Sequence, residues 1–218
     1  MELQNVLNFL ADVKENNNRE WFEAHRDRYE EARTIFTDFV ALLLNEVGKF
    51  DPTITGLVPS DCIFRIYRDV RFSRDKKPYK TNFGASITRG GRKSPYAGYY
   101  LHLEPVRSFA GGGMWMPSGD ILRAVRKEIY IHPEEFKSII EAKAFKRRFG
   151  DLYDEKLKRP PVGFDKDVPH IDLLKYKSYV AGTKLNEDPA DTEAFTKEVV
   201  QDFKIIRPFI DFLNRALD

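Results

Sequence analysis

The chain has 218 residues, of which 42% are hydrophobic, 32% charged and 13% aromatic. This composition excludes a disordered chain, and the length favours a single domain with one sizeable core. No apolar run approaches the ~20 residues of a membrane-spanning helix, and the opening MELQNVLNFL does not have the pattern of a secretory signal. We therefore expect a soluble cytoplasmic protein with no membrane partner.

The formal net charge of +2 hides an uneven distribution of charge along the chain. Between Arg65 and Lys93 there are ten Lys or Arg residues and only two acids, Asp69 and Asp75. Charge separated in this way indicates a basic surface. The single cysteine, Cys62, excludes an internal disulfide and a cysteine-based zinc site, and we interpret it as a small core residue.

The N-terminal part, residues 1–50, has the three- and four-residue spacing of apolar side chains that is typical of helices. A first helix is predicted at 3–13, and the three asparagines at 16–18 end it. A second helix is predicted at 18–48, with the last of these asparagines as its N-cap. Because this helix would be unusually long, we expect a bend or a break near Thr34.

After Cys62 apolar and polar residues alternate, which is the two-residue period of a strand. Short turns between the alternating runs favour an antiparallel meander. Arg68 falls on the apolar side of the first run, so we expect a bulge there or a buried, paired arginine. Four strands are predicted in this region, at 63–72, 83–88, 99–105 and 108–116.

Helices return in the last third of the chain. Ser118 is expected to cap one helix and Pro133 to open another. A final helix begins near Asp188, and Pro208 is expected to kink or restart it. The stretch 150–187 contains several prolines, and we expect it to be irregular.

The predicted fold class is α+β: a central antiparallel β-meander with N-terminal and C-terminal helices packed on one face. We expect one domain over the whole chain. Its successive parts are helical at 1–50, a sheet at 60–117, and helical and irregular at 118–218.

Several stretches together resemble an uncharacterised, mainly bacterial family catalogued as domain of unknown function 2461. The resemblance covers nearly the whole chain and implies a cytosolic single-domain protein, and it brings no reaction, cofactor or catalytic residue. The stretches are NNNREWFEAHRDRYEEAR, FRIYRDVRFSRDKKPYKTNFGA, GYYLHLEP, GGGMWMPSGDILRAVRKEI and PPVGFDKDVPHIDLLKYKS.

If the alternation holds, one face of the sheet is polar and strongly basic. Arginine forks hold phosphate or carboxylate groups in a fixed geometry, and lysines add charge with looser geometry. We therefore predict a site for a small anionic ligand on this face. Its residues are Arg65, Tyr67, Arg68, Arg71, Lys76, Tyr79, Lys80 and Tyr100.

Two other functions are open alternatives. The first is a hydrolase or transferase acting on such a ligand, in which His102 is the general acid–base and Glu104 or Asp69 orients it. The second is nucleic-acid binding, with Tyr67 and Tyr100 as stacking platforms. The charged residues could also simply pair with each other and hold the fold together.

No metal site and no cofactor are predicted. The four histidines lack the HxxxH and HxH spacings of metal sites, and the glycine runs at 89–93 and 111–113 lack the context of a phosphate-binding loop. The oligomeric state is open, and so is the question of whether the stretch 150–187 covers the polar face.

Overall fold

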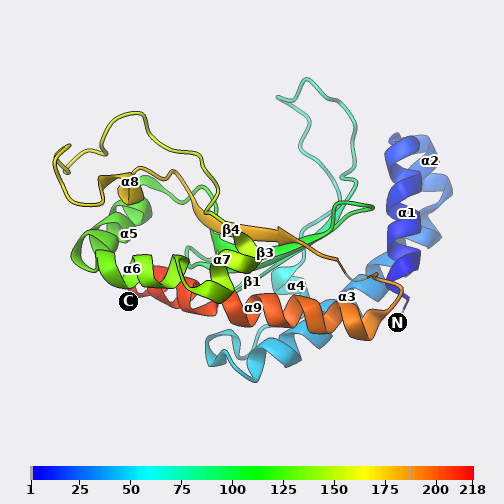
Figure 1. Cartoon of the computed structure of the whole chain (residues 1–218). Helices are drawn as coiled ribbons and strands as arrows, with labels where there is room; N and C mark the ends of the chain where they lie inside the picture. The colour runs from blue at the N-terminus through cyan, green and yellow to red at the C-terminus, as the bar shows by residue number, and fades with distance from the viewer. Residues whose placement is uncertain (1, 187) are drawn as a thin grey trace.

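A four-stranded antiparallel sheet with the strand order β1-β2-β3-β4 lies at the centre of the protein. The computed structural model describes residues 2–186 and 188–218 (Figure 1). Each strand pairs with the next one along the chain, so the predicted antiparallel meander is confirmed. The strands are β1 (Phe83–Thr88), β2 (Gly98–Leu103), β3 (Phe109–Met114) and β4 (Tyr179–Lys184).

The predicted strand at 63–72 is wrong. Residues 64–82 form a long loop that is tied at its base by isolated bridges between Ile63 and Ala85 and between Tyr67 and Tyr79. Beyond these bridges the charged side chains of the loop form hydrogen bonds with each other and with loop carbonyls. These bonds replace the backbone hydrogen bonds that a strand would make with its neighbour. Pro78, which has no N–H to donate, adds to this break in the ladder.

The fourth strand comes from the stretch 150–187, which was expected to be irregular. β4 pairs along its whole length with β3, so the sheet is completed by a segment far away in the sequence. Only Tyr179 and Ala181 of β4 are buried apolar residues, and so short a pattern gave no strand signal.

The helices surround this sheet on one side and at its ends. α2 and α3 are separate helices, because the helical backbone is interrupted at His25. The ring of His25 stacks on Trp21 with 4.2 Å between ring centroids. The break expected near Thr34 is therefore wrong. The helical elements are α1 (Leu3–Glu15), α2 (Arg19–Ala24), α3 (Arg26–Gly48), η1 (Pro52–Ile54), α4 (Pro59–Cys62), α5 (Gly119–Ile131), α6 (Pro133–Ile140), α7 (Lys143–Phe149), α8 (Ile171–Leu174) and α9 (Thr192–Arg215).

The C-terminal helix starts close to its expected position. Its N-cap is Asp191, whose side chain accepts a hydrogen bond from the backbone N–H of Ala194. Pro208 lies inside α9 and does not restart the helix. The predicted helix starts are confirmed, because α5 begins directly after Ser118 and α6 begins at Pro133. Ser118 lies at the N-cap position, but its side chain makes no capping hydrogen bond.

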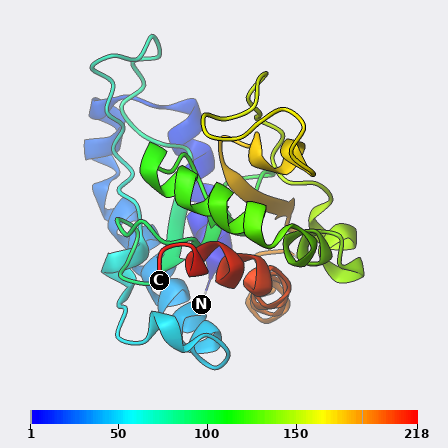
Figure 2. The ribbon, with the colours of Figure 1, turned by 90° about the vertical axis from the view of Figure 1, so that its left-hand side faces the viewer.

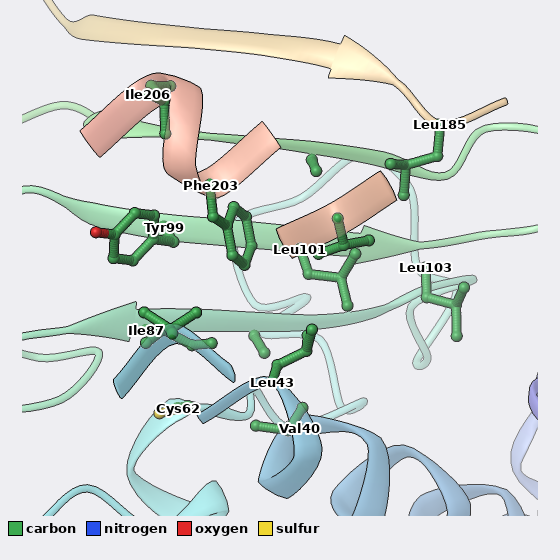
Figure 3. Close-up of a cluster of buried hydrophobic side chains, with 14 of the residues drawn as sticks. Val40, Leu43, Cys62, Ile87, Tyr99, Leu101, Leu103, Leu185, Phe203 and Ile206 are labelled. Carbon is green, nitrogen blue, oxygen red and sulfur yellow. The ribbon is translucent and has the colours of Figure 1, made fainter. Parts of the chain in front are cut away.

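The hydrophobic core lies between one face of the sheet and the helices α3 and α9. Figure 3 shows Tyr99, Leu101 and Leu103 of β2 beside Phe203 of α9 and Leu43 of α3. Each fully buried side chain of this size contributes about 1.5–3 kcal/mol to folding. Burial of these helices against one face of the sheet therefore accounts for much of the stability.

The glycine run in β3 allows this strand to lie unusually close to its neighbours. A Cβ atom on Gly112 would lie 2.7 Å from the carbonyl oxygen of Gly98 and 3.1 Å from Cδ1 of Ile210 on α9. Gly113 has φ = 121°, a conformation that other residues rarely adopt. These glycines are therefore required by the packing of β3.

The opposite side of the sheet carries loops instead of long helices. Figures 1 and 2 both show the loop 64–82 rising on the side of the sheet away from α9. Among the described residues no helix combines the length and apolarity needed to cross a membrane.

Candidate functional site

Aromatic and polar side chains cross the sheet face that points away from α9. One row of residues crosses all four strands. Gly84 of β1 is paired with His102 of β2, His102 with Phe109 of β3, and Phe109 with Lys184 of β4. Phe64 extends the row beyond β1, because its backbone N–H donates to the carbonyl of Gly84. Side chains at registered positions share one face of a sheet. We refer to this surface as the outer face. Its main side chains are Phe64, Asn82, Tyr100, His102, Glu104, Phe109 and Lys184, flanked by Arg65 and Lys80.

His102 is held by hydrogen bonds at both ring nitrogens. Its Nε2 lies 3.2 Å from Oε2 of Glu104, and its Nδ1 lies 3.3 Å from both the hydroxyl of Tyr100 and the amide nitrogen of Asn82. The amide nitrogen can only donate, so Nδ1 is the acceptor and Nε2 carries the proton. Thr81 donates to the other oxygen of Glu104 at 2.7 Å.

The surroundings of His102 favour its neutral form. Burial lowers the pKa of His102 below its ordinary value of 6.5, and the bond to Glu104 offsets this only in part. The ring stacks on Phe109 with 4.7 Å between centroids. At neutral pH the outer face therefore presents an uncharged imidazole whose Nδ1 accepts hydrogen bonds.

Two cations beside this network lack a carboxylate partner. Lys80 is partly buried, with its Nζ 5.5 Å from the ring centroid of Phe64. Burial and the positive charge of Arg65 both lower the pKa of Lys80. Within the described part of the chain neither Lys80 nor Arg65 forms a salt bridge. Neither cation is therefore held in a salt bridge, although the charge of Arg65 also acts on Asp69 and helps to lower the pKa of that carboxyl.

The other predicted cations of the basic segment are bonded inside the loop. Arg68, for which a bulge or a buried, paired arginine was expected, is paired with Asp75 at 2.7 Å but is partly exposed. Arg71 pairs with Asp69 at 2.7 Å. The bond to Arg71 lowers the pKa of Asp69. Lys76 donates to the carbonyl of Val70 at 3.0 Å. These contacts brace the loop and do not reach His102.

Two of the predicted tyrosines lie against α2. Tyr79 is buried and stacks on Phe22 with 3.9 Å between centroids, and Tyr67 contacts both of these rings. The side chain of Asn17 donates to and accepts from the backbone of Tyr79, both at 3.0 Å. Tyr67 and Tyr79 therefore anchor the loop on the N-terminal helices, whereas Tyr100 lies on the outer face.

Several residues of the outer face were missed from sequence. Phe64 fell on the apolar side of the predicted strand 63–72, Phe109 was assigned to neither face of its strand, and Lys184 lies in a strand that was not predicted. Asn82 could have been found, because it precedes Gly84 by two positions and thus continues the polar face of β1.

Lys175 and Lys177 of the stretch 150–187 bond to Asp172 and Glu155 of the same stretch, both at 2.8 Å.

No group of three or more His, Cys, Asp or Glu side chains within residues 2–186 and 188–218 has an arrangement that could hold a metal ion. The candidate site therefore consists of hydrogen-bonding groups, aromatic rings and cations. Such groups can bind an anion, and His102 can also exchange a proton with a bound molecule.

Comparison with known proteins gives one match. A family described as conserved hypothetical protein (DUF2461) matches residues 5–212, which include every strand and nearly every helix. No curated protein and no solved structure matches the chain. The resemblance noted from the sequence is thereby confirmed, and the chain belongs to the conserved hypothetical protein family DUF2461.

Proposed function

We propose that the outer face binds a small molecule carrying a phosphate or carboxylate group, beside Arg65 and Lys80. The observation that carries this proposal is Lys80, a partly buried cation that lies beside the second cation Arg65 and forms no salt bridge among the described residues. Burial of a cation next to a second cation is unfavourable unless an anion compensates for both. A bound anion would supply that missing charge.

The neighbouring groups suit such a ligand. The guanidinium of Arg65 can donate two parallel hydrogen bonds to a phosphate or carboxylate, and Lys80 adds a point charge. The carboxylate of Glu104 is bound by Thr81 and His102 and is not paired with either cation. The lack of a side chain at Gly84 allows the Tyr100 ring to lie against β1, because a Cβ at this position would lie 2.8 Å from the Tyr100 hydroxyl oxygen.

Thermal unfolding in the presence of phosphate, sulfate, carboxylates, sugar phosphates and nucleotides tests the proposal. A molecule that binds only the folded protein raises the melting temperature as its concentration increases. We expect a selective increase with the wild type and none with Lys80→Met. Lys93→Met is the matched control, because Lys93 is also a lysine of the basic segment and is exposed. An equal response of Lys80→Met and the wild type contradicts the proposal.

A second candidate function is acid–base catalysis on the bound anion, with His102 as the reacting group. The hydrogen bonds from Glu104 through His102 to Tyr100 support it, because they fix the tautomer in which Nδ1 is unprotonated. Nδ1 can act as a base when a ligand displaces the groups that now donate to it. These contacts favour Glu104 over Asp69 as the orienting acid, since Asp69 is paired with Arg71 on the loop. Any hydrolysis would use water, because no side-chain nucleophile stands out in this network.

The two candidates are separated by His102→Gln. Glutamine keeps a hydrogen-bonding side chain but cannot exchange a proton as imidazole does. If the site is catalytic, this variant keeps the thermal response to the anion and loses turnover of the anion or its ester. If the wild type leaves every stabilising anion and its ester unchanged, the catalytic reading is rejected and the binding function stands.

A further inference from the structure

The loop 64–82 ends in a strongly basic tip, residues 68–77, that stands away from the sheet (Figure 1). At its end Phe72 is 96% exposed, although phenylalanine is usually buried. The outer face does not use this part of the loop. A single exposed apolar side chain is common on protein surfaces, but Phe72 stands on a tip that is rich in cations.

The tip holds Phe72 in place through its own hydrogen bonds. Arg68 bonds to Asp75 and also to the carbonyl of Lys77, at 2.7 and 3.0 Å. Lys76 donates to the carbonyl of Val70, so the two sides of the tip are joined. The exposed ring is thus carried on a braced turn.

The tip carries five cations and two carboxylates. Both carboxylates are already paired, Asp69 with Arg71 and Asp75 with Arg68. In the described part of the chain Arg74 and Lys77 have no salt-bridge partner. The guanidinium carbon of Arg71 lies 6.0 Å from the ring centroid of Phe72. The tip as a whole therefore carries more positive than negative charge, with Arg74 and Lys77 outside the two salt bridges.

We propose that this loop tip binds single-stranded nucleic acid. A base stacks on the ring of Phe72, and Arg74 and Lys77 contact the neighbouring phosphates. Stacking on an exposed aromatic ring together with backbone phosphate contacts is the general mode of single-strand binding. The inference is independent of the small-anion site, because Arg65 and Lys80 take no part in it.

The composition of the tip favours this partner over a lipid surface. Phe72 is its only largely exposed apolar side chain, and Val70 is partly covered. Stable membrane attachment generally requires more buried apolar surface or a second anchoring signal. A nucleic acid needs only one aromatic ring for each stacked base.

Binding of fluorescently labelled oligo-dT and oligo-U of about 10 nucleotides, a typical single-strand site size, tests the inference by fluorescence anisotropy. We expect Phe72→Ala to weaken binding roughly five-fold or more. Arg74→Ala and Lys77→Ala should each weaken both oligonucleotides and reduce the slope of log affinity against log salt by about 0.7. Val162→Ala is the matched control, because Val162 is 98% exposed and lies in a different part of the chain; it should bind as the wild type does.

Three results overturn the inference. The first is the absence of oligonucleotide binding at low salt, and the second is unchanged binding by Phe72→Ala. The third is binding to anionic phospholipid vesicles that depends on Phe72 while oligonucleotides do not bind, which would make the tip a membrane-contacting surface. Equal melting temperatures of the variants and the wild type ensure that the losses report binding, since every substituted side chain is on an exposed loop.

Discussion

Arg148 and Lys80 are both partly buried cations, but their surroundings differ. Arg148 of α7 contacts Asp202 through its Nε at 2.5 Å and through its Nη2 at 2.7 Å, and it also contacts Glu198 at 2.6 Å. Among the residues that the structure describes, the Lys80 ammonium has beside it the ring of Phe64 and the positive charge of Arg65. A cation that is paired with carboxylates from another element holds the two elements together. A cation without such a carboxylate can instead form an ion pair with a bound ligand. A hollow of about 380 Å³ beside Arg148 is for this reason not the candidate site, since Arg148, Glu198 and Asp202 in its lining are already paired with each other.

Substitution of Arg148 by methionine should have the largest effect on stability. It removes the partner of Asp202, whose carboxylate is only 2% exposed, and an unpaired buried charge costs about 3–5 kcal/mol. Urea unfolding measures this loss. In the double variant Arg148→Met/Asp202→Leu most of the stability should return, because the buried carboxylate of Asp202 is gone and Glu198 still accepts hydrogen bonds from Asn186. A loss below about 1 kcal/mol in the single variant, the range of exposed pairs, would show that this pair is not structural.

Asn17→Ala should have the next largest effect, because it removes both hydrogen bonds to the backbone of Tyr79. We expect a loss of about 1–3 kcal/mol from the unpaired backbone groups, together with faster hydrogen exchange at the loop base. Asn8→Ala is the control, since Asn8 is exposed and its side chain accepts a hydrogen bond from the neighbouring side chain of Gln4 on the same helix. Equal exchange rates in Asn17→Ala and the wild type would show that the loop is held by other contacts.

Lys80→Met should act in the opposite direction to Arg148→Met. Removing an unmatched cation relieves its desolvation and its repulsion by Arg65, so the ligand-free protein should gain up to about 1 kcal/mol. The folded protein holds the Lys80 proton less tightly than the unfolded chain does. Wild-type stability should therefore rise relative to the variant as pH approaches the ordinary lysine pKa of 10.5. A less stable Lys80→Met would mean that Lys80 has a structural role like that of Arg148.

The smallest effect concerns the protonation of His102. Its lowered pKa means that the unfolded chain takes up a proton more readily than the folded protein, so stability is lost as pH falls below 6.5. NMR titration of the ring should show a pKa below that value, and His102→Gln should remove this part of the pH dependence. A ring that titrates at or above 6.5 would show that Glu104 dominates over burial.

The sequence predicted those parts of the fold whose side chains alternate between two uniform environments. In β2, Leu101 and Leu103 face the core while Tyr100 and His102 face outward, and the pattern was correct. The run at 63–72 alternates too, but its residues meet different partners: Ile66 enters the core, Phe64 lies on the outer face and Tyr67 contacts α2. Periodicity cannot separate these cases, because it does not show what lies opposite each residue.

The candidate site was predictable to the same extent. The pairing of His102 with Glu104 follows from their positions two residues apart on one strand. The division of the cations did not follow, because the pairing of Arg68 with Asp75 and of Arg71 with Asp69 depends on how the loop folds. The sequence therefore identified a basic cluster but not which of its members are free.

The late position of β4 has a consequence for synthesis of the chain on the ribosome. β3 ends at Met114, and its partner β4 starts only at Tyr179. Until that segment emerges, the glycine-rich β3 is an open edge that other chains can pair with. Nascent chains that stop before Tyr179 should therefore aggregate, and the rate at which ribosomes cross this interval should influence the yield of folded protein.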